Sequence, residues 1–222
     1  MVSGEELIPR LIELYKRIDR MYVSVAEVIG LQCEGCDGVR CCTVDVTVHT
    51  AVEMLYLRRG FFQLDDFLRE IVSERALAMV RAKEANPFGE KYRQSVCALN
   101  FEGRCLLYEF RPMICRLAGI PHWFVRPDGR RFEGGGCSRY EALGASLPAD
   151  QNIDRTPFYH DLALLESEIV RRRGVKTIPR TIAELLVAYS TGVDVSSPKN
   201  HYYSRANRVG KDRDRGAGGG DV

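Results

Sequence analysis

Eight cysteines in a chain of 222 residues are the feature that most constrains this protein. They form two dense groups, one between residues 33 and 42 and one between residues 97 and 137. The first group is Cys33, Cys36, Cys41 and Cys42, and the second is Cys97, Cys105, Cys115 and Cys137. One or two cysteines can serve as small hydrophobic core residues, but eight in two groups are too many for that role. The cysteines therefore predict either disulfide bonds or metal ligation.

The cellular compartment decides between these two interpretations. The chain starts Met-Val-Ser-Gly-Glu-Glu, which is acidic and lacks the basic and apolar regions of a secretory signal. No apolar run approaches the roughly 18 residues of a membrane span. We therefore expect a cytoplasmic protein with no membrane segment, in which thiols stay reduced and stable disulfides are disfavoured. Metal ligation follows as the expectation, and an export route invisible in the sequence would restore the disulfide interpretation.

The spacing of the first group, C-x2-C-x4-C-C, is typical of a metal-binding loop. A two-residue spacer lets one tight loop direct the sulfurs of Cys33 and Cys36 toward a single ion or cluster. Cys41 and Cys42 are adjacent, and neighbouring side chains in an extended segment point to opposite faces. The pair therefore serves two different sites, or one member ligates while the other packs, unless a kinked loop lets both bind one ion. Two four-sulfur sites and one four-sulfur site with spare thiols both remain open.

The second group is spread over short predicted elements. Seven residues separate Cys97 from Cys105, and residues 100–103 between them read as a hairpin tip. Cys137 follows three consecutive glycines, which can fold their amides around a sulfur atom. Arg111 and Arg116 lie on either side of Cys115. Since four thiolates carry net negative charge at a metal, we expect these two guanidinium groups to offset it and to lower the thiol pKa.

The sequence narrowly favours iron over zinc. Both metals accept four thiolates in tetrahedral geometry. Zinc sites often include histidine, but the nearest histidines, His49 and His122, adjoin neither cysteine group, and we interpret both as ordinary polar or capping residues. A site built from cysteine alone favours an iron–sulfur cluster of the [4Fe–4S] type, with zinc held by four cysteines as the alternative.

The rest of the chain predicts a mainly α fold, with helices packed around a small irregular cysteine-rich metal-binding centre that contains short β-strands. Apolar periodicity, capping boxes and Gly or Pro breaks predict the individual elements. In the first half of the chain these are helix 5–29 ended by Gly30, strand 43–48, a helix opened by the Thr50–Glu53 box and ended by Gly60, and helix 64–85, which directs Leu64, Phe67, Leu68, Ile71, Val72 and Met79 toward the core. In the second half they are a hairpin turning at 127–129, helix 157–174, and a last helix opened by the Thr181–Glu184 box and ended near Gly192.

These elements predict a single cysteine-cluster domain over residues 1–192. Its central part is 33–140, and the helices 5–29 and 157–190 flank it. Residues 193–222 carry Gly, Ser and mixed charge with little to bury, so we expect a disordered tail. The chain has 32 basic and 30 acidic residues. This balance is unlike that of a dedicated nucleic-acid binder, so we expect an unidentified redox or protein partner and neither specific nucleic acid nor membrane.

The two cysteine groups together resemble a known family. Cys33-x2-Cys36-x4-Cys41-Cys42, followed by Cys97-x7-Cys105-x2-Tyr-Glu-x-Arg-Pro-x2-Cys115-Arg, resembles the cysteine-cluster proteins of the CxxCxxCC family, described as a zinc- or iron-chelating domain. The resemblance runs from about Cys33 to Cys137. The four-residue spacer before Cys41 departs from the short form of that family. The resemblance implies metal chelation, and it also suggests a relation to the flagellin lysine N-methylase.

Three functions follow as hypotheses. The first is a metal-binding cysteine-cluster protein with a redox, electron-transfer or structural role. The second is a protein-modifying enzyme resembling a lysine N-methylase, and the third is an interaction module stapled by zinc. Catalytic residues are not identifiable, because Glu53 is most simply a helix cap and Glu109 a partner of Arg111 or of a backbone amide. Whether the protein is an enzyme is left open.

Overall fold

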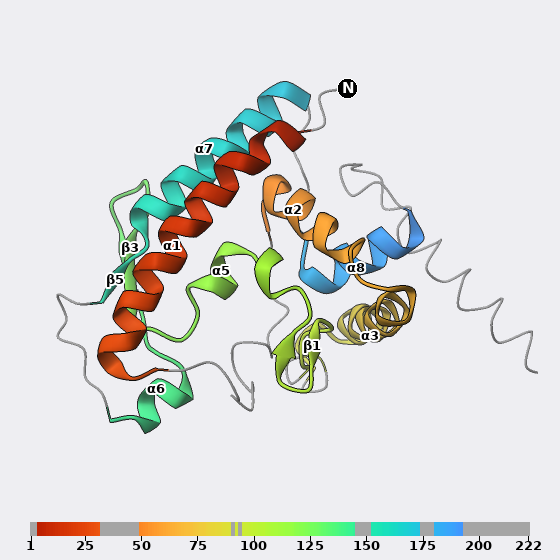
Figure 1. The fold of residues 1–222 in the computed structure, drawn as a ribbon, viewed down its shortest axis with the longest axis horizontal. Helices are drawn as coiled ribbons and strands as arrows, with labels where there is room; N and C mark the ends of the chain where they lie inside the picture. Colours follow the sequence, from red (N-terminus) through yellow and green to blue (C-terminus); the bar gives the residue numbers. More distant parts are fainter. Residues whose placement is uncertain are drawn as a thin grey trace, which may run out of the picture.

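The computed structural model describes residues 4–31, 49–89, 92, 95–144, 152–173 and 180–192 (Figure 1). The first cysteine group, the predicted strand 43–48 and the predicted tail 193–222 lie outside these ranges. The described residues form a mainly helical protein with two small β-sheets, as the sequence predicts.

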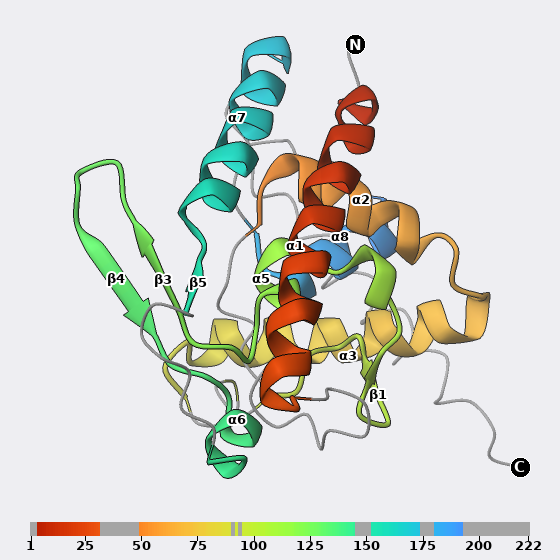
Figure 2. The same ribbon diagram turned by 60° about the vertical axis from the view of Figure 1, so that its left-hand side comes forward.

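Two long helices form one side of the molecule. Helix α1 (Ile8–Ile29) follows a 3₁₀ turn, η1 (Glu5–Leu7), and helix α7 (Thr156–Arg173) lies beside it in the opposite direction (Figures 1 and 2). Helix α1 ends at Gly30, whose φ of 68° is the left-handed conformation that commonly closes a helix. Between the two helices lies the α1–α7 core, which includes Leu11, Leu14, Ile18, Ala51, Val52, Met113, Leu117, Ile120, Phe158, Leu162 and Ile169.

Three further helices surround a second hydrophobic cluster. Helix α2 (Ala51–Phe61) lies between the two halves, and helices α3 (Asp66–Ala85) and α8 (Ile182–Thr191) pack closely against each other. Their buried side chains make the α3–α8 core, which includes Met54, Leu57, Phe61, Val72, Ala76, Val80, Leu99, Leu107, Leu185 and Leu186. Because α2 contributes buried side chains to both clusters, it joins the two halves of the protein.

Two sequence predictions in this region are wrong. Helix α2 does not end at Gly60 but at Phe61, and Gly60 is buried within it. A Cβ at Gly60 would lie 2.5–2.9 Å from side-chain atoms of Phe110, so this glycine serves close packing. Phe67 does not point to the core and is 69% exposed. At about 100° per residue it lies on the side of α3 opposite Val72 and its buried neighbours, which form the face that packs against α8.

Short strands and turns connect the helices. Strands β1 (Asn100–Phe101) and β2 (Arg104–Cys105) form the predicted hairpin, turning at two residues with positive φ, Glu102 and Gly103. In the second sheet β3 (His122–Val125) lies between antiparallel β4 (Arg131–Gly134) and parallel β5 (Ile153–Asp154). The remaining short elements are η2 (Tyr108–Phe110), α5 (Met113–Arg116) and α6 (Ser138–Ala142).

Among the helices in the ranges given above, none combines the length and the apolar character that a membrane crossing requires.

Candidate functional site

The four described cysteines divide between the two cores. Cys97, Cys105 and Cys115 are half-buried at the border of the α3–α8 core, whereas Cys137 is half-buried at the border of the α1–α7 core. No disulfide joins any two of these four residues. The structure therefore brings three members of the second cysteine group to one hydrophobic cluster and places the fourth beside the other.

The β1–β2 hairpin holds Cys97 and Cys105. The carbonyl oxygen of Cys97 accepts a hydrogen bond from the Asn100 amide at 2.9 Å, and Asn100 pairs with Cys105 across the hairpin. The hairpin is fixed to the core by Leu99, which is buried and whose carbonyl accepts the Leu106 amide at 2.9 Å. Both cysteines thus lie at the base of a hairpin whose position is set by core packing.

Cys115 lies on α5, a helix of only four residues. So short a helix is not stable alone, because helix nucleation costs more than one turn of hydrogen bonds returns. Its first amide, that of Met113, donates to the Glu53 carboxylate at 2.9 Å. Glu53 is buried, and the same carboxylate accepts the amide and hydroxyl of Thr50 at 3.0 and 2.9 Å. Glu53 is therefore a cap for α2, as predicted, and also a cap for α5.

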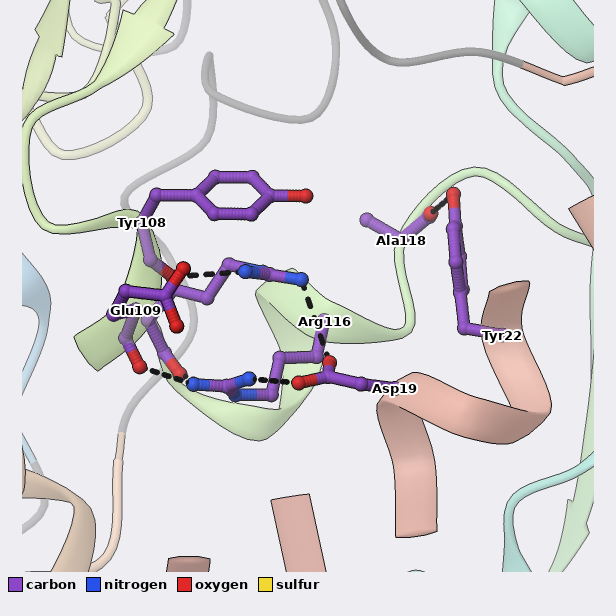
Figure 3. Close-up of polar contacts among 7 residues, drawn as sticks. Asp19, Tyr22, Tyr108, Glu109, Arg116 and Ala118 are labelled. Atoms are coloured by element: carbon purple, nitrogen blue, oxygen red, sulfur yellow. Dashed lines mark hydrogen bonds and ion pairs between the residues drawn. The ribbon is translucent and has the colours of Figure 1, made fainter. Parts of the chain in front are cut away.

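Arg116 fixes the other end of α5 (Figure 3). Its side chain is only 3% exposed. The guanidinium donates to the Asp19 carboxylate and to the backbone carbonyls of Glu109 and Arg111, and it lies 4.1 Å from the centre of the Tyr15 ring. These contacts tie the segment from η2 to α5 into a closed loop and fasten that loop to α1.

Arg111 is held in a similar way on the exposed side of this segment. Its guanidinium donates to the Tyr108 carbonyl at 2.8 Å, lies 3.4 Å from the Asp19 carboxylate and covers the Tyr108 ring at 3.7 Å. Asp19, not Glu109, is thus the acidic side chain that pairs with Arg111. The predicted charge compensation of thiolates by Arg111 and Arg116 stays a prediction, because the contacts described for both guanidinium groups are with Asp19, carbonyl oxygens and aromatic rings.

Tyr15 connects the two fixed ends of α5. Its hydroxyl donates to the Glu53 carboxylate at 3.2 Å, while its ring lies against Arg116. Burial, and then the charge of Glu53, hold the pKa of Tyr15 well above its usual range, so the hydroxyl remains a donor. We call Tyr15, Asp19, Glu53 and Arg116 together the α5 clamp. Tyr15 and Asp19 were not among the functional residues predicted from the sequence, although their four-residue spacing on a predicted helix places them on one face.

Cys137 is fixed by the loop Leu117–Gly119. Its amide donates to the Gly119 carbonyl at 3.0 Å, and its sulfur accepts the Tyr140 amide at 3.5 Å. A Cβ built on Gly119 would lie 3.5 Å from the Cys137 sulfur and 3.7 Å from a methyl group of Leu31. Cys137 therefore lies near Leu31, the last described residue before the first cysteine group.

The two histidines considered in the sequence have different surroundings. His49 is buried just before α2, and its amide donates to the Arg180 carbonyl at 3.1 Å. Burial lowers the pKa of His49, and the nearby Glu53 charge opposes that shift. His122 lies on β3, and burial, followed by the charge of Arg155, lowers its pKa.

A cavity of about 390 Å³ lies between α1 and the η2–α5 segment. Its walls include both Asp19, a member of the α5 clamp, and Leu31, which precedes the first cysteine group. Among the described residues, the cavity is lined by Asp19, Tyr22, Val23, Ala26, Glu27, Gly30, Leu31, Tyr108 and Arg111. The cavity thus adjoins the supporting contacts of Cys115 rather than a set of catalytic groups.

The described cysteines do not make a metal site by themselves. In the ranges that the structure describes, no three His, Cys, Asp or Glu side chains are grouped so that they would hold a metal ion. A site that uses Cys97, Cys105, Cys115 or Cys137 therefore needs further ligands, for which the sequence offers Cys33, Cys36, Cys41 and Cys42. The convergence of the two groups stays a prediction, since the first group lies outside the described residues.

Comparisons of this chain with protein-family models, with curated proteins and with solved structures found no match. The resemblance to the cysteine-cluster family is therefore still a prediction that rests on the cysteine spacing and the Tyr-Glu-x-Arg-Pro motif.

Proposed function

We propose that this chain is a metal-binding cysteine-cluster protein that holds an iron–sulfur cluster or, alternatively, zinc. The observation that carries the proposal is the placement of Cys97, Cys105 and Cys115. These residues come from a hairpin and a separate short helix, yet they border one hydrophobic core as half-buried thiols. Thiolates are the ligands that both zinc and iron–sulfur clusters prefer.

Chain connectivity adds support for the participation of the first group. Cys33 follows Leu31 by two residues, and two residues of chain span at most about 7 Å. Leu31 lies near Cys137, so a connection of this length is compatible with a shared site for Cys33 and Cys137. We propose that Cys33, Cys36, Cys41 and Cys42 supply the ligands that the second group lacks.

Either a redox or a structural role is compatible with this placement. An iron–sulfur cluster would supply one-electron chemistry, whereas a structural zinc ion contributes on the order of 10 kcal/mol to folding in small domains. The second role suits elements such as α5 and the two-residue strands, which have little stability of their own. No contact among the described residues favours methyl transfer or partner binding, so we propose neither of these alternatives.

The first test is metal content. Protein purified without oxygen is expected to contain iron and sulfide, with about four iron atoms for each [4Fe–4S] cluster, and to absorb visible light. A colourless protein with stoichiometric zinc would contradict the iron–sulfur form of the proposal and support the zinc form. A folded, metal-free protein in which all eight thiols react with a thiol reagent would contradict both forms of the proposal.

The second test assigns the ligands. Cys97→Ser, Cys105→Ser and Cys115→Ser are each expected to reduce bound metal strongly, because a hydroxyl is a poor substitute for a thiolate at these metals. Ser138→Ala, a change beside Cys137 that removes no thiol, is the matched control and should keep its metal. Full metal content in all three cysteine variants would rule out Cys97, Cys105 and Cys115 as ligands.

A further inference from the structure

We infer that Tyr15, Asp19, Glu53 and Arg116, the α5 clamp, are positioning residues for Cys115 at the proposed metal centre. The inference rests on the proposed function and adds a set of supporting residues to it. None of the four is a proposed ligand, and three of them belong to α1 and α2, which lie outside the second cysteine group. Figure 3 shows the contact between two of them, Asp19 and Arg116.

The need for such support follows from the length of α5. Four residues form a single turn, and Cys115 is its third residue. The Cys115 amide donates to the Pro112 carbonyl at 3.0 Å, which is the only backbone contact described for that amide within the turn. A metal ligand on a single unsupported turn would lose conformational freedom on binding, and this cost would weaken metal affinity.

The clamp removes this freedom from both ends of α5. At the first residue, the buried Glu53 carboxylate accepts the Met113 amide at 2.9 Å. At the last residue, Arg116 binds the carbonyls of Glu109 and Arg111, which precede the turn. Cys115 is therefore held between two anchors that reach the backbone rather than the sulfur.

The clamp also connects these anchors to α1. Asp19 accepts a hydrogen bond from Arg116, and Tyr15 contacts both Arg116 and Glu53. Because the described contacts of Arg116 are with Asp19, two carbonyl oxygens and the Tyr15 ring, we assign Arg116 a geometric role, which the test below separates from an electrostatic one. The planar guanidinium of Arg116 donates to three acceptors in fixed directions. The ammonium group of a lysine at this position could not reach all three acceptors in the same geometry.

This distinction between geometry and charge gives the test. Arg116→Lys keeps the positive charge but loses the fixed geometry, and Arg116→Met loses both. If Arg116 positions Cys115, both variants should bind metal roughly 10- to 100-fold more weakly in competition with a chelator, the range observed when outer supporting residues of metal sites are removed. If Arg116 acts by charge, Arg116→Lys should retain the affinity of the unmodified protein, and this result would overturn the inference.

A matched control is available on α3. Arg75 also donates to a backbone carbonyl near the cysteines, that of Asn100 at 2.9 Å, but its side chain is exposed and it has no part in the clamp. Arg75→Lys is expected to leave metal affinity unchanged. Tyr15→Phe removes only the hydroxyl that reaches Glu53 and serves as the gentler variant if the Arg116 variants do not fold.

Hydrogen exchange of the metal-free chain supplies a readout that does not depend on metal. The amides of Met113–Arg116 should exchange faster in Arg116→Lys and Tyr15→Phe than in the unmodified chain, while the amides of α3 keep their protection. Unchanged protection of α5 would overturn the inference and leave the proposed function intact. If the unmodified chain binds no metal, the proposed function fails, and the positioning role fails with it even where α5 is protected.

Discussion

Two helices of this protein begin with the same four-residue pattern and the same local structure, yet the two regions differ in what surrounds them. The Thr50–Glu53 box opens α2, and the Thr181–Glu184 box opens α8, each with the reciprocal hydrogen bonds of a capping box. The two boxes even lie side by side, because the residues before them, His49 and Arg180, form a β-bridge.

The difference lies in the second use of each glutamate. Glu53 accepts hydrogen bonds from Tyr15 and from the Met113 amide, so it joins α1 and α5 to α2. Glu184 pairs with Lys83 of α3 at 2.8 Å, at a site where the lysine is about one-third exposed. The comparison teaches that the local pattern determines where a helix starts, whereas the tertiary contacts of its glutamate determine how much else depends on it.

The largest expected effect comes from deleting each glutamate side chain. Glu53→Ala leaves the Tyr15 hydroxyl and the Met113 and Thr50 amides without an acceptor in a buried site, and we expect a loss of about 3–5 kcal/mol in unfolding free energy. Glu184→Ala leaves one buried amide, that of Thr181, without this acceptor and removes an ion pair with the partly exposed Lys83, for which about 1–2 kcal/mol is expected. Urea unfolding of both variants measures the difference. Equal losses of unfolding free energy in the two variants would contradict the claim that more of the structure depends on Glu53 than on Glu184.

A smaller effect is expected from the glycine near the end of each helix. Gly60→Ala places a methyl group 2.5–2.9 Å from Phe110 atoms, so we expect overpacking to cost about 1–3 kcal/mol. Gly192→Ala meets no atom within 4 Å and loses only the ease of a φ of 66°, which costs about 1 kcal/mol. Thermal unfolding monitored by circular dichroism compares the two. A harmless Gly60→Ala would show that the Phe110 ring moves aside freely.

The smallest expected effect is a pH dependence of the unfolding free energy. Of the two residues that form the bridge before the boxes, His49 and Arg180, the histidine before α2 contributes it. Burial lowers the pKa of His49 below that of an unfolded histidine, so the unfolded chain binds more protons than the folded one. Stability from His49 is therefore present above its unfolded pKa and is lost as the pH falls from that value through the lower pKa of the folded state. His49→Gln should show a shallower decrease in unfolding free energy than the unmodified chain between pH 7 and 5. Parallel curves for the two proteins would exclude a contribution of His49.

Much of the fold could be predicted from local signals. Both capping boxes, the Gly30 end of α1 and the two hairpins follow from residues close together in sequence, and the structure has all of them. The orientation of Phe67 could not be predicted in the same way, because it depends on which face of α3 meets α8. A hydrophobic residue in the first turn of a helix carries no local sign of that choice.

The candidate site divides along the same line. Cysteine spacing identifies candidate ligands, and Arg111 and Arg116 on either side of Cys115 mark this segment as a candidate part of the site. Arg111 and Arg116 both pair with Asp19, which precedes them by 92 and 97 positions in the sequence. No pattern within the cysteine region contains that information, so the role of α1 in supporting Cys115 emerges only from the fold.

The loop Leu117–Gly119 has a consequence for how the chain reaches this fold. Its three successive carbonyl groups accept hydrogen bonds from Arg155, Tyr22 and Cys137, which lie 38, 96 and 18 residues away. Such a loop cannot settle until distant parts of the chain have arrived, so we expect it to be completed late in folding. For the same reason it should resist the insertions that most surface loops accept, and an added residue there would misalign three elements at once.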